Sequence, residues 1–315
     1  MKKEDKIFIA GHNGLVGSAI VRKLREEGFT NLVMRASKEL DLRDKAAVTN
    51  FFASEKPAYV FFAAGTVGGI MANKTYPADF IYNNVSMIFN TIDAAYRHQV
   101  KKLLYLGSSC IYPKSCPQPI KEEYMLTGQL EETNKPYALA KIAGIELCAS
   151  YNRQFGTDYI SLMPTNMFGI NDNYDLQNSH LVAALIRKFY EAKAKKASFV
   201  ELWGSGAPRR EILSSDQLAN ACFYFMQQYS GSDIINIGCG EDHTISELAG
   251  MIKSISGYEG EIKFDSSKPD GTMKKQLDVS RATGLGWSAK SNISEDLKRA
   301  YHDFSDNYER YTKTI

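Results

Sequence analysis

Four reactive side chains stand at short, regular spacings in the middle of the chain. Ser108 precedes Cys110 by two residues, and Tyr137 precedes Lys141 by four. Residues four apart lie on the same face of a helix, so the phenol and the ammonium group would be neighbours. A hydroxyl, a phenol and an ammonium group are able to deliver a proton to a ketone oxygen. The thiol beside them suggests a second reaction.

Ordinary structural roles compete with this interpretation. A tyrosine and a lysine four residues apart often form no more than a pair on a helix surface. A single cysteine is usually a small, buried apolar residue. The chemistry therefore depends on which elements carry these residues and on what precedes them in the chain.

Apolar runs alternate with helical patterns along the first half of the chain. The runs typical of strands are residues 6–10, 32–34, 59–64, 102–106 and 159–163. Helical spacing of apolar residues follows the first four, over residues 18–27, 45–54, 78–98 and 136–155. Such alternation predicts a parallel sheet with helices on both faces. We therefore expect an α/β fold with a Rossmann-type, doubly wound parallel sheet.

Three glycines separate the first predicted strand from the first predicted helix. Gly11, Gly14 and Gly17 fit the pattern G-x-x-G-x-x-G. The first permits a tight turn, the second lets the backbone approach a pyrophosphate, and the third lets helix and strand pack closely. The helix N-terminus adds free N–H groups for the phosphates. A glycine triplet alone is often only a loop, but this order of elements predicts dinucleotide binding.

The second half of the chain begins after Pro164 with a polar segment. Beyond it we predict helices over 181–194 and 216–229, a strand over 199–203, and a strand over 234–237 that returns to the main sheet. A final surface-packed helix follows from the spacing of Leu297, Tyr301, Phe304, Tyr308 and Tyr311. We expect residues 1–165, joined by about 214–240, to form the dinucleotide-binding domain. Residues 166–315 would form mainly a smaller C-terminal α/β substrate-binding domain.

Composition argues against several classes of protein. The 315 residues carry a formal net charge of +2, which argues against broad adhesion to nucleic acid or membranes. No stretch approaches the roughly 20 apolar residues of a membrane span. The chain starts without a signal-peptide pattern, so we expect a cytoplasmic protein.

The five cysteines form no C-x-x-C pair and have no histidine at metal-ligand spacing, so we expect no metal site. We interpret Cys148, Cys222 and Cys239 as buried apolar residues in a reducing compartment.

Together, the glycine turn, Ser108 and the segment 137–141 resemble the extended short-chain dehydrogenase/reductase family over nearly the whole chain. Within it, the chain is most similar to the GDP-L-fucose synthases, which combine 3,5-epimerase and 4-reductase activities. That closer likeness rests on residues 67–73, 76–82, 107–113, 163–166, 178–180, 203–206 and 267–271.

The resemblance implies NADPH-dependent reduction of the C4 ketone of a GDP-4-keto sugar. Tyr137 would supply the proton, Lys141 would lower the pKa of that phenol and hold the nicotinamide ribose, and Ser108 would bind the ketone oxygen. The resemblance also implies epimerisation at C3 and C5, with Cys110 as base and His180 as acid. His180 has an alternative explanation as a cap of the helix that starts at Leu181.

The same resemblance assigns residues to the two ligands. NADP(H) would contact Gly11, Asn13, Gly14, Leu15, Val16, Gly17, Arg35, Asp41, Leu42, Ala63, Ala64, Gly65, Leu106, Lys141, Pro164, Asn166 and Met167. Asp41 would hold the adenine edge, or would simply cap the helix before Lys45. The GDP-sugar would contact Asn166, Lys188, Trp203, Arg210 and Asp270, each of which has an ordinary explanation as a surface charge or core aromatic residue. Helices 78–98 and 136–155 correspond to those of a two-fold interface in relatives, which implies a homodimer.

Several positions depart from the family pattern. Asn13 and Ser37 stand where fucose synthases carry arginine, and Lys188 replaces another arginine. The choice of NADP over NAD therefore depends mainly on Arg35, which suits a 2′-phosphate. Three alternatives stay open: a GDP-4-keto-heptose 4-reductase with or without epimerase activity, an NAD-dependent 4-epimerase or 4,6-dehydratase, and a non-catalytic dinucleotide-binding protein.

Overall fold

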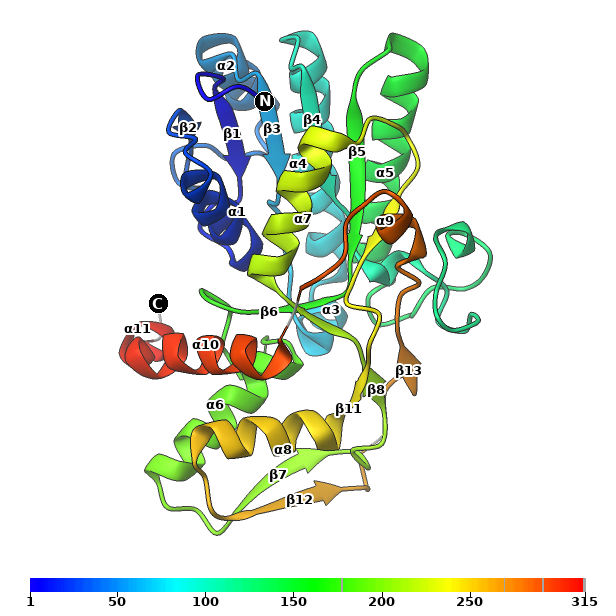
Figure 1. Cartoon of the computed structure of the whole chain (residues 1–315). Coiled ribbons are helices and arrows are strands. Elements are labelled where there is room, and N and C mark those ends of the chain that lie inside the picture. The colour runs from blue at the N-terminus through cyan, green and yellow to red at the C-terminus, as the bar shows by residue number, and fades with distance from the viewer. Residues whose placement is uncertain (177, 269, 291, 314–315) are drawn as a thin grey trace.

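A six-stranded parallel sheet forms the larger part of the molecule, which we call the main lobe (Figure 1). The computed structural model describes residues 1–313 except 177, 269 and 291. The sheet contains β1 (Ile7–Ala10), β2 (Leu32–Val33), β3 (Tyr59–Phe62), β4 (Lys102–Leu106), β5 (Tyr159–Pro164) and β10 (Ile235–Ile237), in the order β10-β5-β4-β3-β1-β2. Every pairing in it is parallel. The predicted return of the strand near residue 235 to this sheet is confirmed.

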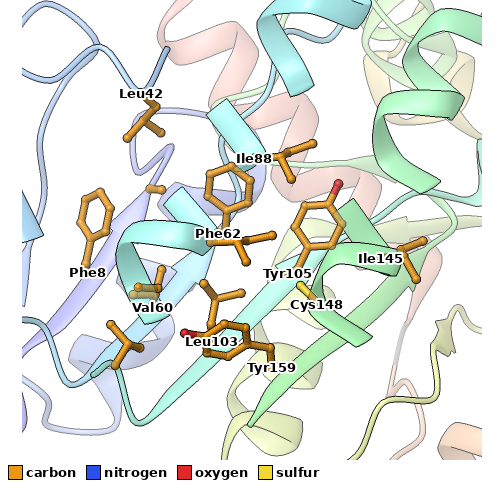
Figure 2. Close-up of a cluster of buried hydrophobic side chains, with 14 of the residues drawn as sticks. Phe8, Leu42, Val60, Phe62, Ile88, Leu103, Tyr105, Ile145, Cys148 and Tyr159 are labelled. Atoms are coloured by element: carbon orange, nitrogen blue, oxygen red, sulfur yellow. The ribbon is translucent and has the colours of Figure 1, made fainter. Parts of the chain in front are cut away.

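Helices cover both faces of the sheet, as predicted for a doubly wound fold. Side chains from α2 (Lys45–Glu55), α4 (Pro77–Arg97) and α5 (Lys135–Phe155) share one hydrophobic core with the strands. Figure 2 shows part of this core, where Phe62 and Tyr105 from neighbouring strands lie beside Ile88 and Ile145 of the covering helices. Helices α1 (Leu15–Glu26) and α7 (Ser215–Gln228) share the core of the opposite face.

A second lobe lies beyond the carboxyl edge of the sheet and has its own hydrophobic core (Figure 1). Its helices are α6 (Leu181–Ala194), α8 (Ile245–Ser256), α10 (Ile293–Asp306) and α11 (Tyr308–Thr312). Strands β7 (Phe199–Trp203) and β12 (Glu261–Asp265) pair in parallel, while β8 (Arg209–Arg210) lies between β11 (His243–Thr244) and β13 (Lys274–Lys275). Strands β6 (Asn166–Phe168) and β9 (Ile212–Ser214) pair where the lobes meet, and α9 (Ser280–Gly284) packs beside β10.

Several elements differ from the sequence-based prediction. The predicted final helix is divided into α10 and α11, because Asn307 leaves the helical conformation between them. Helix α3 (Ile70–Thr75) was not predicted; it is six residues long, and its final turn runs into the proline that opens α4. Cys148 and Cys222 are buried as expected, whereas Cys239 is only half-buried.

Glu211 connects three segments of the chain at the junction of the lobes. Its side chain is fully buried, and its two carboxylate oxygens accept hydrogen bonds from the backbone N–H of Gly240 at 2.7 Å and of Leu277 at 2.8 Å. Buried backbone N–H groups need such partners. This carboxylate therefore fixes the position of the strands that lead into the cleft. None of the helices within the described residues is long and apolar enough to span a membrane.

Candidate active site

A cleft of about 1090 Å3 runs along the carboxyl edge of the main sheet. Parallel sheets of this type bind ligands at that edge, where the loops after the strands converge. The catalytic residues expected from the sequence, Ser108, Cys110, Tyr137, Lys141 and His180, all line this one cleft. So do all the expected cofactor residues except Gly17.

The glycine turn has the shape that a pyrophosphate requires. Gly11 has a φ of 84°, and a Cβ there would lie 2.7 Å from the backbone nitrogen of Ala64. A Cβ on Gly17 would collide with the carbonyl oxygen of Gly11, so this glycine is needed for packing. A Cβ on Gly14 would meet only that carbonyl oxygen, at an ordinary 3.5 Å. Protein packing therefore does not require glycine at position 14, whereas a phosphate approaching the helix N-terminus does.

Charged residues after β2 line one part of the cleft. The Arg35 guanidinium lies 2.5 Å from a carboxylate oxygen of Glu55 and donates to the carbonyl oxygen of Met34 at 2.9 Å. Arg43 pairs with Asp41 through Nη2 and Oδ2 at 2.7 Å. The alternative role of Asp41 as a helix cap is wrong, because Asp44 accepts from the first backbone N–H groups of α2. Both Arg35 and Asp41 are thus engaged with protein partners.

Ser108, Tyr137 and Lys141 are brought together by β4 and the start of α5. Ser108 follows β4, and its Oγ accepts the backbone N–H of Cys110 at 3.3 Å. Because this bond uses a lone pair, the hydroxyl hydrogen stays available for a substrate oxygen. The Lys141 ammonium donates to the carbonyl oxygen of Leu106 at 2.7 Å and lies 5.7 Å from the centre of the Tyr137 ring.

Burial dominates the ionisation of this set. It lowers the pKa of Lys141 to about 8. Burial also raises the pKa of the Tyr137 phenol, and the neighbouring Cys110 thiol raises it further. The prediction that Lys141 lowers the pKa of this phenol is therefore wrong, because burial and Cys110 raise it instead. In this state Tyr137 is a neutral phenol at physiological pH and carries the proton that a ketone oxygen needs.

Cys110 and His180 approach the cleft from different lobes. Cys110 lies in the 3₁₀ turn Ser109–Ile111 and is only 8% exposed. Burial raises the pKa of its thiol, while the charges of Lys275 and Lys141 and the Ser108 hydrogen bond oppose that rise. His180 precedes α6, but its imidazole makes no capping hydrogen bond, so it is free to face the cleft. Protein around the imidazole lowers its pKa.

Lys275 is a cleft residue that the sequence did not reveal. It lies on β13 opposite Arg210 of β8, and its side chain lines the cleft near Cys110. Burial lowers the pKa of its ammonium group, and the thiol of Cys110 opposes this shift. The two-residue strand that carries it has no recognisable pattern in the sequence. Its positive charge acts on the thiol from the second lobe.

The residues expected to bind the GDP-sugar fall into two groups. Asn166 lines the cleft and donates to the carbonyl oxygen of Glu211 at 2.8 Å. The other four, Lys188, Trp203, Arg210 and Asp270, do not line it. Trp203 ends β7 with 65% of its surface exposed, and Asp270 accepts hydrogen bonds from the backbone and hydroxyl of Ser205. Pro269, in the motif 267–271, lies outside the described residues.

Two of these four lie close together at the strand ends of the second lobe. The charge of Asp270 raises the pKa of Arg210, although burial lowers it more. Arg210 also donates to the carbonyl oxygen of Thr272 at 2.6 Å. Lys188 donates instead to the carbonyl oxygen of Glu201 at 3.0 Å. Within the described part of the chain, no group of three or more histidine, cysteine, aspartate or glutamate residues is arranged to hold a metal ion.

Comparison with known proteins agrees with this architecture. The model of the NAD dependent epimerase/dehydratase family matches residues 7–238. GDP-L-fucose synthase 1 of Arabidopsis thaliana is 53% identical over 305 residues, which cover 97% of this chain and 94% of that protein. GDP-L-fucose synthase of Escherichia coli (strain K12) is 50% identical over 317 residues, covering 98% of this chain and 99% of that protein.

A solved structure extends the comparison to three dimensions. It is described as MlghC, GDP-mannoheptose C4 reductase from Campylobacter jejuni with NADP bound. It is 39% identical, covers 97% of this chain and 99% of its own, and superposes with a TM-score of 0.89. These findings confirm the resemblance to the GDP-L-fucose synthases and to the Rossmann-type fold. The chain belongs to the NAD dependent epimerase/dehydratase family.

Proposed function

We propose that this enzyme epimerises a GDP-4-keto sugar at C3 and C5 and then reduces its C4 ketone with NADPH, as a GDP-L-fucose synthase does. The observation that carries the proposal is the convergence of a hydroxyl, a phenol, a thiol and an imidazole on one cleft beside a dinucleotide-type glycine turn. The names of relatives at 50% and 53% identity support the substrate class.

The cofactor supplies the hydride for C4 when it is bound. Tyr137 donates its proton to the ketone oxygen as negative charge develops there. Ser108 donates a hydrogen bond to the same oxygen, and the ammonium group of Lys141 stabilises the phenolate that remains. Lys141 is buried and Ser108 and Tyr137 are half-buried, which strengthens these interactions because less water screens them than at the surface.

Epimerisation uses the acidity of the C–H bonds on either side of the ketone. Cys110 as thiolate removes a proton from C3 or C5, and the resulting enolate oxygen is stabilised by Ser108 and Tyr137. His180 returns a proton on the opposite face of the sugar. The approach of these two residues from different lobes supports an exchange across two faces.

A GDP-4-keto-heptose is the second candidate substrate. It is favoured by the likeness to MlghC, whose description names a GDP-mannoheptose C4 reductase. Ser108, Tyr137 and Lys141 would reduce the ketone of either substrate. The two candidates therefore differ only in the sugar that the second lobe accepts.

We also propose a homodimer formed through α4 and α5, which pack beside each other. Both helices expose large apolar side chains, including Tyr82 and Phe89 on α4 and Leu139 and Phe155 on α5. Several large apolar side chains exposed on two adjacent helices are typical of a protein interface. Residues 1–165 with 214–240 would form the dinucleotide-binding domain of each subunit, and the rest mainly the substrate-binding domain.

Product analysis in deuterated water tests the proposal. Supplied with GDP-4-keto-6-deoxymannose and NADPH, the enzyme should consume the cofactor stoichiometrically and incorporate deuterium at C3 and C5. Reduction without deuterium at C3 and C5 would show that the enzyme is a 4-reductase without epimerase activity. Turnover without net cofactor consumption would instead identify a 4-epimerase or dehydratase. The same assay with a GDP-4-keto-heptose separates the two substrates.

A further inference from the structure

The cations that line the cleft are mostly engaged by the protein itself. Arg35 pairs with Glu55 and Arg43 with Asp41, while Lys141 donates to a backbone carbonyl oxygen. A dinucleotide brings two negative charges in its pyrophosphate alone. Arg310 also lines the cleft, and no carboxylate of the described residues lies within 4.0 Å of its guanidinium, whose hydrogen-bond partner is the neutral amide of Asn171.

Arg310 reaches the glycine turn from the other end of the chain. It lies on α11, which Figure 1 shows at the end of α10, below the start of α1. Its Nη2 donates to Oδ1 of Asn171 at 2.9 Å, and Nδ2 of Asn171 donates to the carbonyl oxygen of Asn13 at 2.5 Å. One amide side chain thus separates the guanidinium from the turn. Arg310 lines both the main cleft and a smaller cavity of about 360 Å3 beside His12 and Asn13.

The segment that positions Arg310 is firmly held. Asn171 adopts a left-handed backbone conformation with a φ of 67°, and its N–H donates to Asp303 at 3.0 Å. The Tyr311 hydroxyl donates to the same carboxylate oxygen at 2.6 Å. The Tyr311 ring also packs against Tyr174, with ring centres 4.8 Å apart. Helix α11 is therefore a fixed part of the cleft wall.

We propose that Arg310 is a ligand of the cofactor pyrophosphate, so that the C-terminal helix completes the dinucleotide site. This inference rests on the proposed binding of NADP(H). Its guanidinium lies beside the turn whose N–H groups receive a pyrophosphate, and arginine binds phosphate through two parallel hydrogen bonds. The side chain of Asn13, in the turn itself, is neutral.

Nearby carboxyl groups do not neutralise this cation. Asp303 accepts hydrogen bonds from Asn171 and Tyr311 and lines only the smaller cavity. Asp172 does line the main cleft, but burial raises its pKa to about 7, which leaves a large fraction of it uncharged at neutral pH. The 2′-phosphate is assigned instead to the segment after β2, where Arg35 and Lys38 line the cleft, so a pyrophosphate ligand is distinguished by its equal effect on NADPH and NADH.

Binding titrations of the full-length protein with NADPH and NADH test the inference. Arg310→Gln should weaken both cofactors by about tenfold or more, since a hydrogen bond to a charged group is lost in each. Arg310→Lys keeps the charge and should restore part of the affinity. Lys313→Gln, at the residue that follows α11, is the matched control, because Lys313 pairs with Glu309 at 3.2 Å and does not line the cleft. It should bind both cofactors like the wild type.

The salt dependence of binding and a second variant, Asn171→Gly, distinguish a phosphate ligand from a residue that only stabilises the cleft wall. Salt screens a charge–charge contact, so Arg310→Gln should make cofactor affinity less dependent on salt. Asn171→Gly preserves the left-handed backbone but removes the amide link, and it should leave the salt dependence of the wild type. Identical behaviour of these two variants would overturn the inference, as would unchanged affinity in Arg310→Gln or weakening confined to NADPH. A wild-type protein that binds neither cofactor would instead overturn the proposed function.

Discussion

The ammonium nitrogen of Lys141 lies 5.7 Å from the centre of the Tyr137 ring, one helical turn away, while it donates to the carbonyl oxygen of Leu106 at 2.7 Å. The carbonyl group ends β4, the strand that also leads to Ser108. The charge of Lys141 is thereby fixed relative to both proton-handling hydroxyl groups. This arrangement determines how the enzyme should respond to substitution and to pH.

Tyr137→Phe should reduce the rate of ketone reduction by about 10²- to 10⁴-fold, because it removes only the acidic proton. The ring remains, with its edge contact to Phe80 at 6.4 Å between ring centres. Single-turnover oxidation of NADPH measures the loss. Thermal unfolding and NADPH titration serve as controls and should match the wild type. Unchanged reduction would contradict the assignment of Tyr137 as proton donor.

Lys141 should impose a pH dependence on stability. Its pKa is about 8 in the folded protein and about 10.4 in an unfolded chain, so between these values the unfolded state binds more protons. Wild-type stability should therefore rise from pH 8 to pH 10 relative to Lys141→Met. Urea unfolding of both proteins across this range measures the difference. Reduction should slow above about pH 8, as the ammonium group loses its charge. A constant stability difference would contradict the lowered pKa.

Cys110→Ser should abolish deuterium uptake at C3 and C5 while leaving reduction of an already epimerised ketone largely intact. In the wild type, deuterium uptake should increase with pH, because burial holds the thiol pKa above its ordinary value and the thiolate is the base. Mass spectrometry of recovered substrate follows the exchange. Cys148→Ser, at a buried position that does not line the cleft, is a control for the loss of any thiol. Simultaneous loss of exchange and reduction in Cys110→Ser would contradict this division of roles.

Lys275→Met should shift the pH profile of deuterium exchange to higher pH, because the charge of Lys275 lowers the pKa of Cys110. Reduction by Tyr137 should change much less. The adjacent Lys274→Met is the matched control, since Lys274 pairs with Asp242 at 3.2 Å and does not line the cleft. A parallel fall in both reactions, with no shift of the profile, would indicate a purely structural role for Lys275.

Glu211→Ala should destabilise the protein by about 2–5 kcal/mol, because two buried N–H groups lose their acceptors. These are the N–H groups of Gly240 and Leu277. Glu211→Gln retains one acceptor oxygen and should cost about 1–2 kcal/mol. Denaturant unfolding followed by circular dichroism measures both. Equal stabilities of the two variants would show that the carboxylate does not hold these segments together.

Much of the main lobe was predictable because its signals are local. Alternating apolar runs and helical spacing indicated the strands and helices, and the boundaries of α6 and β7 agree with the prediction. The two-residue strands β8, β11 and β13 carry no such periodicity. Lys275 was missed for that reason. Its place in the cleft depends on pairing with β8, about 65 residues earlier in the chain.

Contacts between residues far apart in the sequence could not be predicted from it either. Arg35 appeared suited to a 2′-phosphate from its position alone, but the structure pairs it with Glu55, twenty residues later on α2. The spacing of Tyr308 and Tyr311 indicated a helix, yet nothing in it placed Arg310 beside a turn near the N-terminus. Sequence patterns report which face a residue occupies, whereas these contacts arise only when the faces meet.

The residues proposed for reduction come from one stretch of the main lobe, between Leu106 and Lys141, whereas His180 and Lys275 reach the cleft from separate segments. The two activities therefore differ in how much of the molecule must be in place. Substitutions confined to the segments that carry His180 and Lys275 would impair stereochemical inversion first and leave a simple ketone reductase. Evolutionary change in these two segments would in the same way remove epimerisation while the reductive residues of the main lobe stay intact.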